Sequence, residues 1–281
     1  MGTALITGAS SGIGREFCWQ VAAAGHNLVV VARDKERLEA LAHNIRRANQ
    51  VEVEVLAADL ADPEGLADVC LRLSAHGLES PAATITNFDG EQTLDYLPLV
   101  DEGELQPIGL LINAAGLGSE RPFLDNDFDS ELYGLDVMVR AVLATCYSAG
   151  RAMRSRGRGT IINVSSVAAD TGMGPYSAHK AWVRAFTEGL AEELRGSGVT
   201  ATAVMPGLVK TEFHQRAGAD FSHAPELAWS SSKKVVEQSL AAARRGQVLF
   251  TPTLRYRALA GLQRVAPRSL VRKVTRKLPH M

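Results

Sequence analysis

A tyrosine and a lysine stand four residues apart in the stretch "MGPYSAHKAW", where an apolar, helix-like segment begins. On a helix this spacing makes the side chains of Tyr176 and Lys180 neighbours. A free phenol has a pKa of about 10, but a nearby ammonium group stabilises the phenolate and lowers that pKa. The pair could therefore exchange a proton with a substrate oxygen near neutral pH. A surface pair without chemistry is the alternative, and other parts of the chain bear on the choice.

A second group of residues could bind phosphate. The segment "ALITGASSGIGREF" places Gly8, Gly12 and Gly14 directly after an apolar strand-like run and at the start of a helix-like one. Glycines in this position let backbone N–H groups approach a phosphate, and the start of a helix favours its negative charge. The strand, turn and helix context predicts dinucleotide binding.

The composition indicates an ordinary globular protein. The chain has 281 residues, 46% of them hydrophobic and 22% charged, with a net charge of -1. Its apolar runs are all shorter than the roughly eighteen residues of a membrane span. Cys18, Cys70 and Cys146 stand alone, without the spacing of metal ligands, so we expect reduced, buried thiols and no metal site. The expected location is cytoplasmic, and we expect no nucleic-acid partner.

Strand-like and helix-like segments alternate along the chain. The strand-like runs are "TALIT", "NLVVVA", "VEVEVLAA", "IGLLINAA", "GTIINVS", "GVTATAVMP" and "QVLF", and helices are expected over 12–24, 34–48, 63–75, 130–155, 176–196 and 224–243. Runs that are apolar on successive residues are typical of parallel strands covered on both faces. The pattern predicts a single α/β domain over residues 1–254, with a Rossmann-type, doubly wound parallel sheet of about seven strands.

Two segments depart from this pattern. Residues 76–107 form an acidic insertion with seven acidic residues and no lysine or arginine. We expect a flap or a functional lid there, with a hairpin turn at residues 89–90. Residues 255–281 form a basic amphipathic tail, and residues 238–281 hold ten lysines and arginines and no acidic residue. The tail is expected either to cover the substrate pocket or contact another subunit, or to attach peripherally to an anionic membrane.

The segment from Thr7 to Gly14, together with the distant Tyr176-x-x-x-Lys180 motif, resembles the short-chain dehydrogenase/reductase family. The resemblance covers residues 3 to about 250, apart from the insertion. It implies hydride transfer between a nicotinamide and a carbonyl or alcohol carbon, with Tyr176 as the acid or base and Lys180 holding the nicotinamide ribose. It also implies a homodimer or homotetramer.

The same resemblance assigns further residues. Of the two serines in "INVSSVAA", it selects Ser166 over Ser165 to hold the substrate oxygen, although the interval from Ser166 to Tyr176 is shorter than is common in the family. Asp59 resembles the aspartate that contacts the adenine ring. The cofactor residues implied are Gly8, Ser10, Ser11, Gly12, Ile13, Gly14, Arg33, Asp59, Leu60, Asn113, Ala114, Ala115, Gly116, Tyr176, Lys180, Pro206, Gly207 and Thr211.

The end of the second strand-like run, "VVVARD", bears on the choice of cofactor. Ala32 stands where relatives that prefer NAD have an acid for the ribose hydroxyls. Arg33 follows, and its planar guanidinium suits a 2′-phosphate. Asp34 is the rival residue, but it stands where a helix cap is expected. The sequence therefore favours NADP(H).

Two positions complicate the expected site. Met138 stands where many relatives have an asparagine that holds a water between the active-site lysine and solvent. A thioether accepts hydrogen bonds weakly and donates none, so it cannot reproduce that link. His179 lies between Tyr176 and Lys180 in the chain, and we expect it on the helix surface.

A segment over residues 208–232 resembles the family's substrate loop. It contains Phe213, His214, Phe221 and Trp229, and this apolar content indicates a lipophilic substrate. The prediction is an NADP(H)-dependent oxidoreductase that reduces a lipophilic ketone or aldehyde, or oxidises the corresponding alcohol. The alternative, motivated by Met138, is a catalytically impaired dinucleotide-binding sensor or scaffold.

Overall fold

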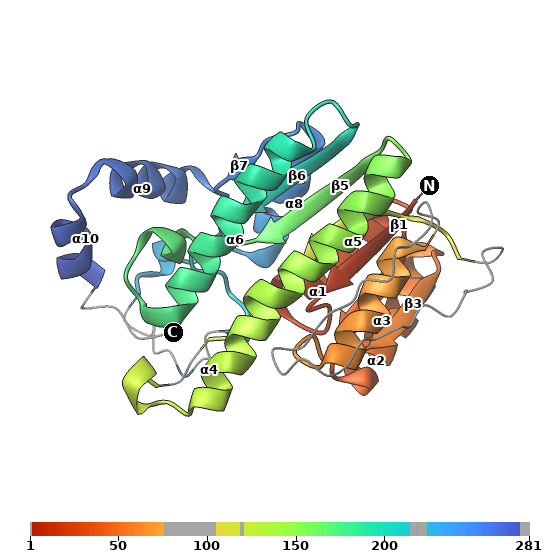
Figure 1. Cartoon of the computed structure of the whole chain (residues 1–281), viewed down its shortest axis with the longest axis horizontal. Coiled ribbons are helices and arrows are strands. Elements are labelled where there is room, and N and C mark those ends of the chain that lie inside the picture. The colour runs from red at the N-terminus through yellow and green to blue at the C-terminus, as the bar shows by residue number, and fades with distance from the viewer. Residues whose placement is uncertain (1, 76–104, 119–120, 214–217, 219–223, 276–281) are drawn as a thin grey trace, which may run out of the picture.

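The computed structural model describes residues 2–75, 105–118, 121–213, 218 and 224–275. Within these ranges seven strands form one sheet in the order β3-β2-β1-β4-β5-β6-β7, with every neighbouring pair parallel (Figure 1). The strands are β1 (Thr3–Thr7), β2 (Asn27–Ala32), β3 (Val53–Ala57), β4 (Ile108–Asn113), β5 (Gly159–Val164), β6 (Val199–Val204) and β7 (Leu249–Phe250). This confirms the predicted doubly wound parallel sheet.

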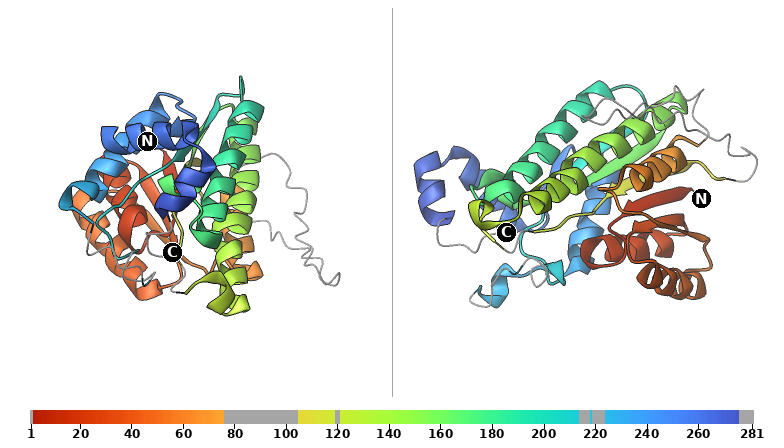
Figure 2. Two further views of the ribbon diagram at one scale, coloured as in Figure 1. Left: turned by 90° about the vertical axis from the view of Figure 1, so that its left-hand side faces the viewer. Right: turned by 60° about the horizontal axis from the view of Figure 1, so that its bottom comes forward.

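Helices cover both faces of the sheet (Figures 1 and 2). One face carries α3 (Pro63–Ser74), α5 (Ala141–Ser155) and α6 (Gly174–Glu193), and the other carries α1 (Gly12–Ala23), α2 (Lys35–Asn49) and α8 (Ser232–Arg244). The remaining helical elements are η1 (Phe123–Asp125), α4 (Phe128–Leu135), a π-helical turn η2 (Asp136–Arg140), η3 (Val167–Asp170), η4 (Glu226–Ala228), α9 (Leu254–Val265) and α10 (Arg268–Thr275).

One expected helix begins later than predicted. Residues 224–243 were expected to be helical throughout, but α8 starts at Ser232. Ser231 has extended backbone angles, and its hydroxyl accepts a hydrogen bond from the Lys234 backbone N–H at 3.3 Å. A serine in this conformation caps a helix N-terminus, so it fixes the start of α8.

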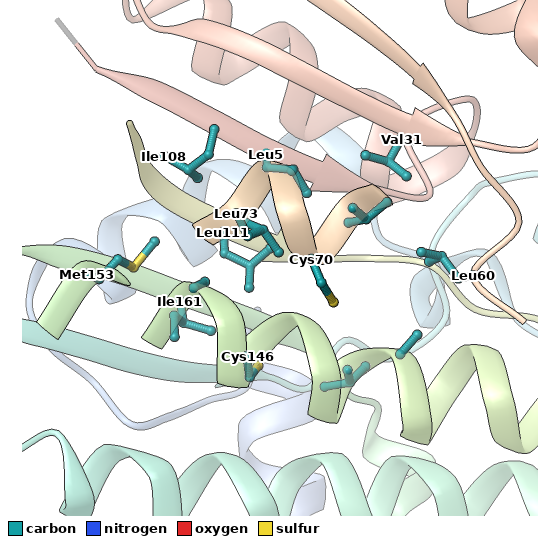
Figure 3. Packing of buried hydrophobic residues seen from close by; sticks show 14 of the residues in the cluster. Leu5, Val31, Leu60, Cys70, Leu73, Ile108, Leu111, Cys146, Met153 and Ile161 are labelled. Atoms are coloured by element: carbon teal, nitrogen blue, oxygen red, sulfur yellow. The ribbon is translucent and has the colours of Figure 1, made fainter. Parts of the chain in front are cut away.

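The core follows from the alternation of side chains along the strands. Leu5 faces α3 and α5, whereas its neighbours Ala4 and Ile6 face α1 and α2 on the other side of the sheet. Figure 3 shows the first cluster, in which Leu111 of β4 packs with Leu73 of α3. Each buried leucine of this kind contributes roughly 1.5–3 kcal/mol to stability.

Polar side chains are buried between the two central strands and the helices above them. Asn113 Nδ2 donates to Asn163 Oδ1 at 2.9 Å, linking β4 to β5. Thr145 Oγ1 of α5 donates to Asn113 Oδ1 at 3.0 Å, and Asn163 Nδ2 donates to Thr187 Oγ1 of α6 at 3.0 Å. Because unpaired buried amides are costly, this network favours one relative placement of the four elements.

Several expectations fall outside the described residues. They concern residues 76–104 of the acidic insertion, with the hairpin turn at 89–90, as well as His214, Phe221 and residues 276–281. Residues 254–275 of the tail form α9 and α10. Among the described helices, none combines the length and the apolar character that crossing a membrane requires.

Candidate active site

A cavity of about 790 Å³ opens at the carboxyl ends of the strands. It lies where the strand order reverses between β1 and β4, which is where doubly wound sheets bind ligands. The predicted residues that line it are Gly8, Ser10, Ser11, Gly12, Ile13, Gly14, Arg33, Asp59, Leu60, Ala114, Ala115, Gly116, Ser166, Tyr176, Lys180, Pro206, Gly207 and Thr211. Asn113 does not line the cavity, because its side chain takes part in the buried amide network below it.

The turn between β1 and α1 has no room for a side chain at Gly8 or Gly14. Gly8 and Gly12 have φ angles of +66° and +53°, which favour glycine. A side chain at Gly14 would overlap the carbonyl oxygen of Gly8. Thr7 Oγ1 accepts hydrogen bonds from the backbone N–H groups of Ala114 and Ala115, at 3.1 and 3.2 Å, and so holds the loop after β4 against this turn. The result is a backbone cradle at a helix N-terminus, which suits a phosphate.

At one end of the cavity an arginine packs on a tyrosine that the sequence analysis missed. The Arg33 guanidinium carbon lies 5.4 Å from the centre of the Tyr133 ring, and an Arg33 nitrogen lies 3.9 Å from an Asp59 oxygen. Tyr133 donates a hydrogen bond to Asp59 at 3.1 Å. The Arg33 side chain is 66% exposed, so its charge can meet an anion. Asp34 instead caps α2, accepting from the Arg37 backbone N–H at 3.0 Å.

The predicted catalytic side chains meet in the same cavity. Ser166 Oγ accepts a hydrogen bond from the Ala168 backbone N–H at 3.1 Å and lies near enough to the Tyr176 phenol to lower its pKa. Lys180 Nζ donates to the Val164 carbonyl oxygen at 2.9 Å and lies 5.8 Å from the centre of the Tyr176 ring. The Ser165 hydroxyl turns the other way and donates to the Lys180 carbonyl oxygen at 2.6 Å. Ser166 therefore faces the cavity while Ser165 fastens α6 to the end of β5.

The electrostatics of this group differ from the expectation that Lys180 lowers the phenol pKa. Burial raises the pKa of Tyr176 to about 12, and the nearby Ser166 hydroxyl acts in the opposite direction. Burial also lowers the pKa of Lys180 to about 8, because the ammonium is removed from water. Desolvation thus dominates both groups. At neutral pH the phenol is protonated and able to donate.

The other end of the cavity is apolar. Phe213 lies 5.8 Å from Tyr176 between ring centres, and both pack with Leu117 and Met173. Leu259 of α9, an apolar residue of the expected amphipathic tail, also lines the cavity. Since few polar groups converge here apart from Ser166 and Tyr176, this end suits an apolar ligand with one oxygen.

Tyr256 of α9 closes the wall of the cavity and was also missed. Its hydroxyl donates to the Ala228 carbonyl oxygen at 2.8 Å and accepts from the Leu208 backbone N–H at 3.0 Å. Its ring packs on Gly207 so closely that a side chain there would overlap it. Tyr256 therefore ties the two ends of the segment that carries Thr211 and Phe213. In the sequence, the amphipathic periodicity of the tail was the signal that could have indicated this contact.

Met138 of η2 and His179 of α6 both approach Gly134 of α4, where an added methyl group would lie 3.7 and 3.8 Å from their side chains. Met138 is 3% exposed and packs with Tyr176 and Met173, from within the π-helical turn η2. His179 is half-buried, not on the helix surface as expected, because residues three apart on a helix, here Tyr176 and His179, share a face. Burial and the Lys180 charge lower its pKa. Its Nδ1 atom has no hydrogen-bond partner within the described residues.

Comparison with known proteins decides the family. A family model described as short chain dehydrogenase matches residues 2–79 and 73–221. The chain belongs to the short-chain dehydrogenase/reductase family. It is an oxidoreductase of the dehydrogenase/reductase type that acts on alcohol or ketone groups. A curated relative, the very-long-chain 3-oxoacyl-CoA reductase of Anas platyrhynchos, is 29% identical over 78% of this chain, which spans 63% of that relative's length.

Solved structures of this family show the same fold. A short-chain dehydrogenase from Sphingobium yanoikuyae in complex with NADPH is 32% identical, with a TM-score of 0.77 over 94% of each chain. The bulky-bulky ketone specific alcohol dehydrogenase from Comamonas testosteroni is 29% identical, with a TM-score of 0.72 over 99% of each chain. The match to the second structure covers 99% of this chain, so it extends over α9 and α10.

The buried Lys180 ammonium should appear in the pH dependence of stability. Its pKa is about 8 in the fold and 10.5 in the unfolded chain, so between these values the unfolded state binds more protons. As the pH rises, the free energy of unfolding of the wild type should therefore increase more than that of Lys180→Met. The difference should be at most about 1.4 kcal/mol per pH unit. Urea denaturation at several pH values between about 7 and 9.5 measures this. Lys234→Met removes an exposed lysine and should parallel the wild type. Parallel curves for Lys180→Met would contradict the assignment.

Proposed function

We propose that the chain is an NADP(H)-dependent oxidoreductase that reduces a lipophilic ketone or aldehyde, or oxidises the corresponding alcohol. The observation that carries this is one cavity with three suitable parts: a glycine cradle, an exposed arginine at one end, and Ser166, Tyr176 and Lys180 beside an apolar wall at the other. The names of the solved relatives, one in complex with NADPH and one specific for bulky ketones, support the same choice.

The residues present fit such a cofactor. The turn containing Gly8, Gly12 and Gly14 would hold its pyrophosphate, because it lies at the N-terminus of α1 and its glycines carry no side chain. Arg33, with Arg37 beside it in the cavity wall, would hold the 2′-phosphate. Gly116 and Lys180 would hold the nicotinamide ribose. The two residues lie side by side, since a methyl group at Gly116 would be 3.4 Å from Lys180 Nζ. When bound, the nicotinamide supplies or accepts the hydride.

The side chains of this chain would handle the substrate oxygen. Ser166 and Tyr176 would both hydrogen-bond to it, which orients the carbonyl carbon and favours negative charge on the oxygen in the transition state. With a pKa of about 12, Tyr176 is protonated at neutral pH and can donate its proton to the forming alkoxide. In the reverse direction it would accept that proton. Lys180, whose pKa is lowered by burial, would exchange protons with the site more readily than an exposed lysine.

Replacing the phenol tests the reaction. Tyr176→Phe should lower kcat for NADPH-dependent ketone reduction by about 100- to 10,000-fold, because the proton donor is lost while the ring is kept. The measurement is NADPH oxidation over a panel of small and bulky ketones and aldehydes. Tyr147→Phe, which alters a tyrosine that is 55% exposed on α5, is the matched control and should retain full activity. Tight NADPH binding with no turnover in wild type or variant would instead support the sensor or scaffold that Met138 suggests.

Replacing the arginine tests the cofactor choice. Arg33→Ala should weaken NADPH binding by about 10- to 100-fold, while NADH binding changes little, because the guanidinium would pair with the 2′-phosphate. Fluorescence titration with both cofactors measures the two dissociation constants. Arg47→Ala removes an exposed arginine of α2 outside the cavity and should change neither. Equal losses for NADPH and NADH in Arg33→Ala would contradict the assignment.

The wall formed by α9 should set the size of the substrate. Leu259→Trp should lower kcat/KM for bulky ketones about ten-fold more than for small ones, since Leu259 lines the apolar end of the cavity. Leu262→Trp places the same side chain one turn further, at a position that is 64% exposed and outside the cavity, and should leave the ratio unchanged. A uniform change across the panel for Leu259→Trp would show that α9 does not contact the substrate.

We also propose that the chain forms a homodimer or homotetramer in the cytoplasm. The helices α4 and α5 expose an apolar stripe that includes Leu132, Leu135 and Leu143, which are 42–48% exposed. A contiguous apolar face of this kind on a family enzyme favours contact with another subunit. Light scattering of the purified chain, with an expected mass of two or four chains, tests this.

A further inference from the structure

Helix α9 is apolar on two opposite sides. Tyr256 and Ala260 lie on its inner side, where Ala260 is 5% exposed and Tyr256 packs on Gly207. On its outer side Leu254, Ala258 and Leu262 follow at four-residue spacing, so they share a face. Leu254 is 76% exposed and Leu262 is 64% exposed. Solvent normally meets the polar side of a helix, so the outer leucines indicate a surface with a partner.

Helix α10 continues this surface. Leu270 is 53% exposed, while its neighbour Val271 is 6% exposed and faces the protein. Figures 1 and 2 show α9 and α10 together at one end of the molecule, away from the centre of the sheet. The two helices thus present an outer face with leucines at both ends.

The same face is strongly basic. Arg255, Arg272 and Lys273 are exposed cationic residues of these helices, whereas Arg257 packs on the Phe250 ring and Arg268 contacts the Asp170 carbonyl oxygen. Residues 238–281 hold ten lysines and arginines and no acidic residue, whereas residues 1–237 hold 20 basic and 31 acidic residues. The charge is therefore concentrated on one part of the chain. Its partner should be anionic as well as apolar.

We propose that the outer face of α9 and α10 binds an anionic lipid bilayer. Exposed leucines flanked by arginines match an interfacial helix, whose apolar face enters the lipid while the cations meet the headgroups. Each lysine or arginine near an anionic surface strengthens such binding by about five-fold. A second copy docking symmetrically by this face would bring arginines against arginines. A bilayer meets both the apolar and the cationic groups.

Because this face lies on a helix that also borders the cavity, membrane contact would have a role in substrate access. Leu259 and Tyr256, on the same helix, line the apolar end of the cavity. Leu227, which is 73% exposed, lies next to Ala228, whose carbonyl oxygen Tyr256 contacts. A bilayer bound to α9 would therefore lie beside the substrate end, and a lipophilic substrate could pass between lipid and cavity. The binding itself does not depend on the proposed reaction, so it can be tested without activity.

Deleting the tail would not be a clean test. Tyr256 holds the segment between Leu208 and Ala228, and Arg268 Nη1 donates to the Asp170 carbonyl oxygen at 2.8 Å. Asp170 ends the turn that begins at Ser166, so truncation would disturb the site as well as the surface. Substitutions on the outer face avoid both contacts.

The experiment is co-sedimentation of the full chain with vesicles. The wild type should bind vesicles of phosphatidylcholine with about one-third phosphatidylglycerol, bind pure phosphatidylcholine at least about ten-fold more weakly, and release as salt increases. The double variant Leu254→Glu, Leu262→Glu should lose at least about ten-fold in affinity for the anionic vesicles, because each glutamate removes apolar contact and adds repulsion. Leu124→Glu changes a leucine that is 90% exposed in η1 and should bind like the wild type.

Two further measurements keep the result interpretable. A thermal melt of each variant should match the wild type, since both substituted positions are exposed. Light scattering reports whether the double variant changes the number of chains in the assembly. The proposal is overturned if the wild type does not bind anionic vesicles, or if the double variant binds them as tightly as the wild type. A lower assembly mass in the double variant, with vesicle binding unchanged, would assign this face to another copy of the chain.

Discussion

The geometry of the site depends on a buried ammonium group at the end of strand β5. Lys180 Nζ donates to the Val164 carbonyl oxygen at 2.9 Å, and the Ser165 hydroxyl donates to the Lys180 carbonyl oxygen at 2.6 Å. Two hydrogen bonds thus join one strand end to one turn of α6. Ser166 follows Ser165, and Tyr176 lies one turn before Lys180, so this junction brings their hydroxyls together. The pKa of Lys180 is lowered because burial removes its charge from water, which disfavours the ammonium form.

How much of this could be predicted depends on the range of the interactions. The glycine turn and the Tyr176–Lys180 pair could be predicted because each lies within one turn or one helix. The spacing of their residues along the chain then fixes how they are placed relative to one another. The alternation of apolar runs was enough to predict the sheet, because parallel strands need cover on both faces. Ser166 could be chosen over Ser165 by resemblance, and the structure gives the reason in the opposite directions of the two hydroxyls.

The residues that were missed depend on contacts between distant segments. Tyr133 meets Asp59 across 74 positions of sequence, and Tyr256 meets Leu208 across 48. No local pattern reports such a pairing. Asn113 shows the converse: its place in a motif suggested cofactor contact, but its amide completes a buried network with Asn163 and Thr145. Met138 likewise contributes packing against Tyr176, where the related proteins were expected to supply a hydrogen bond.

The order of the elements along the chain has a consequence for synthesis. All seven strands, the glycine turn and the Ser166, Tyr176 and Lys180 group precede α9 in the sequence. Tyr256, which closes the cavity wall, emerges from the ribosome after them. A nascent chain can therefore expose β1 to β6 and the phosphate cradle before Tyr256 is available to tie the segment between Leu208 and Ala228. In the order of synthesis, the wall of the pocket is therefore the last part of the site to become available.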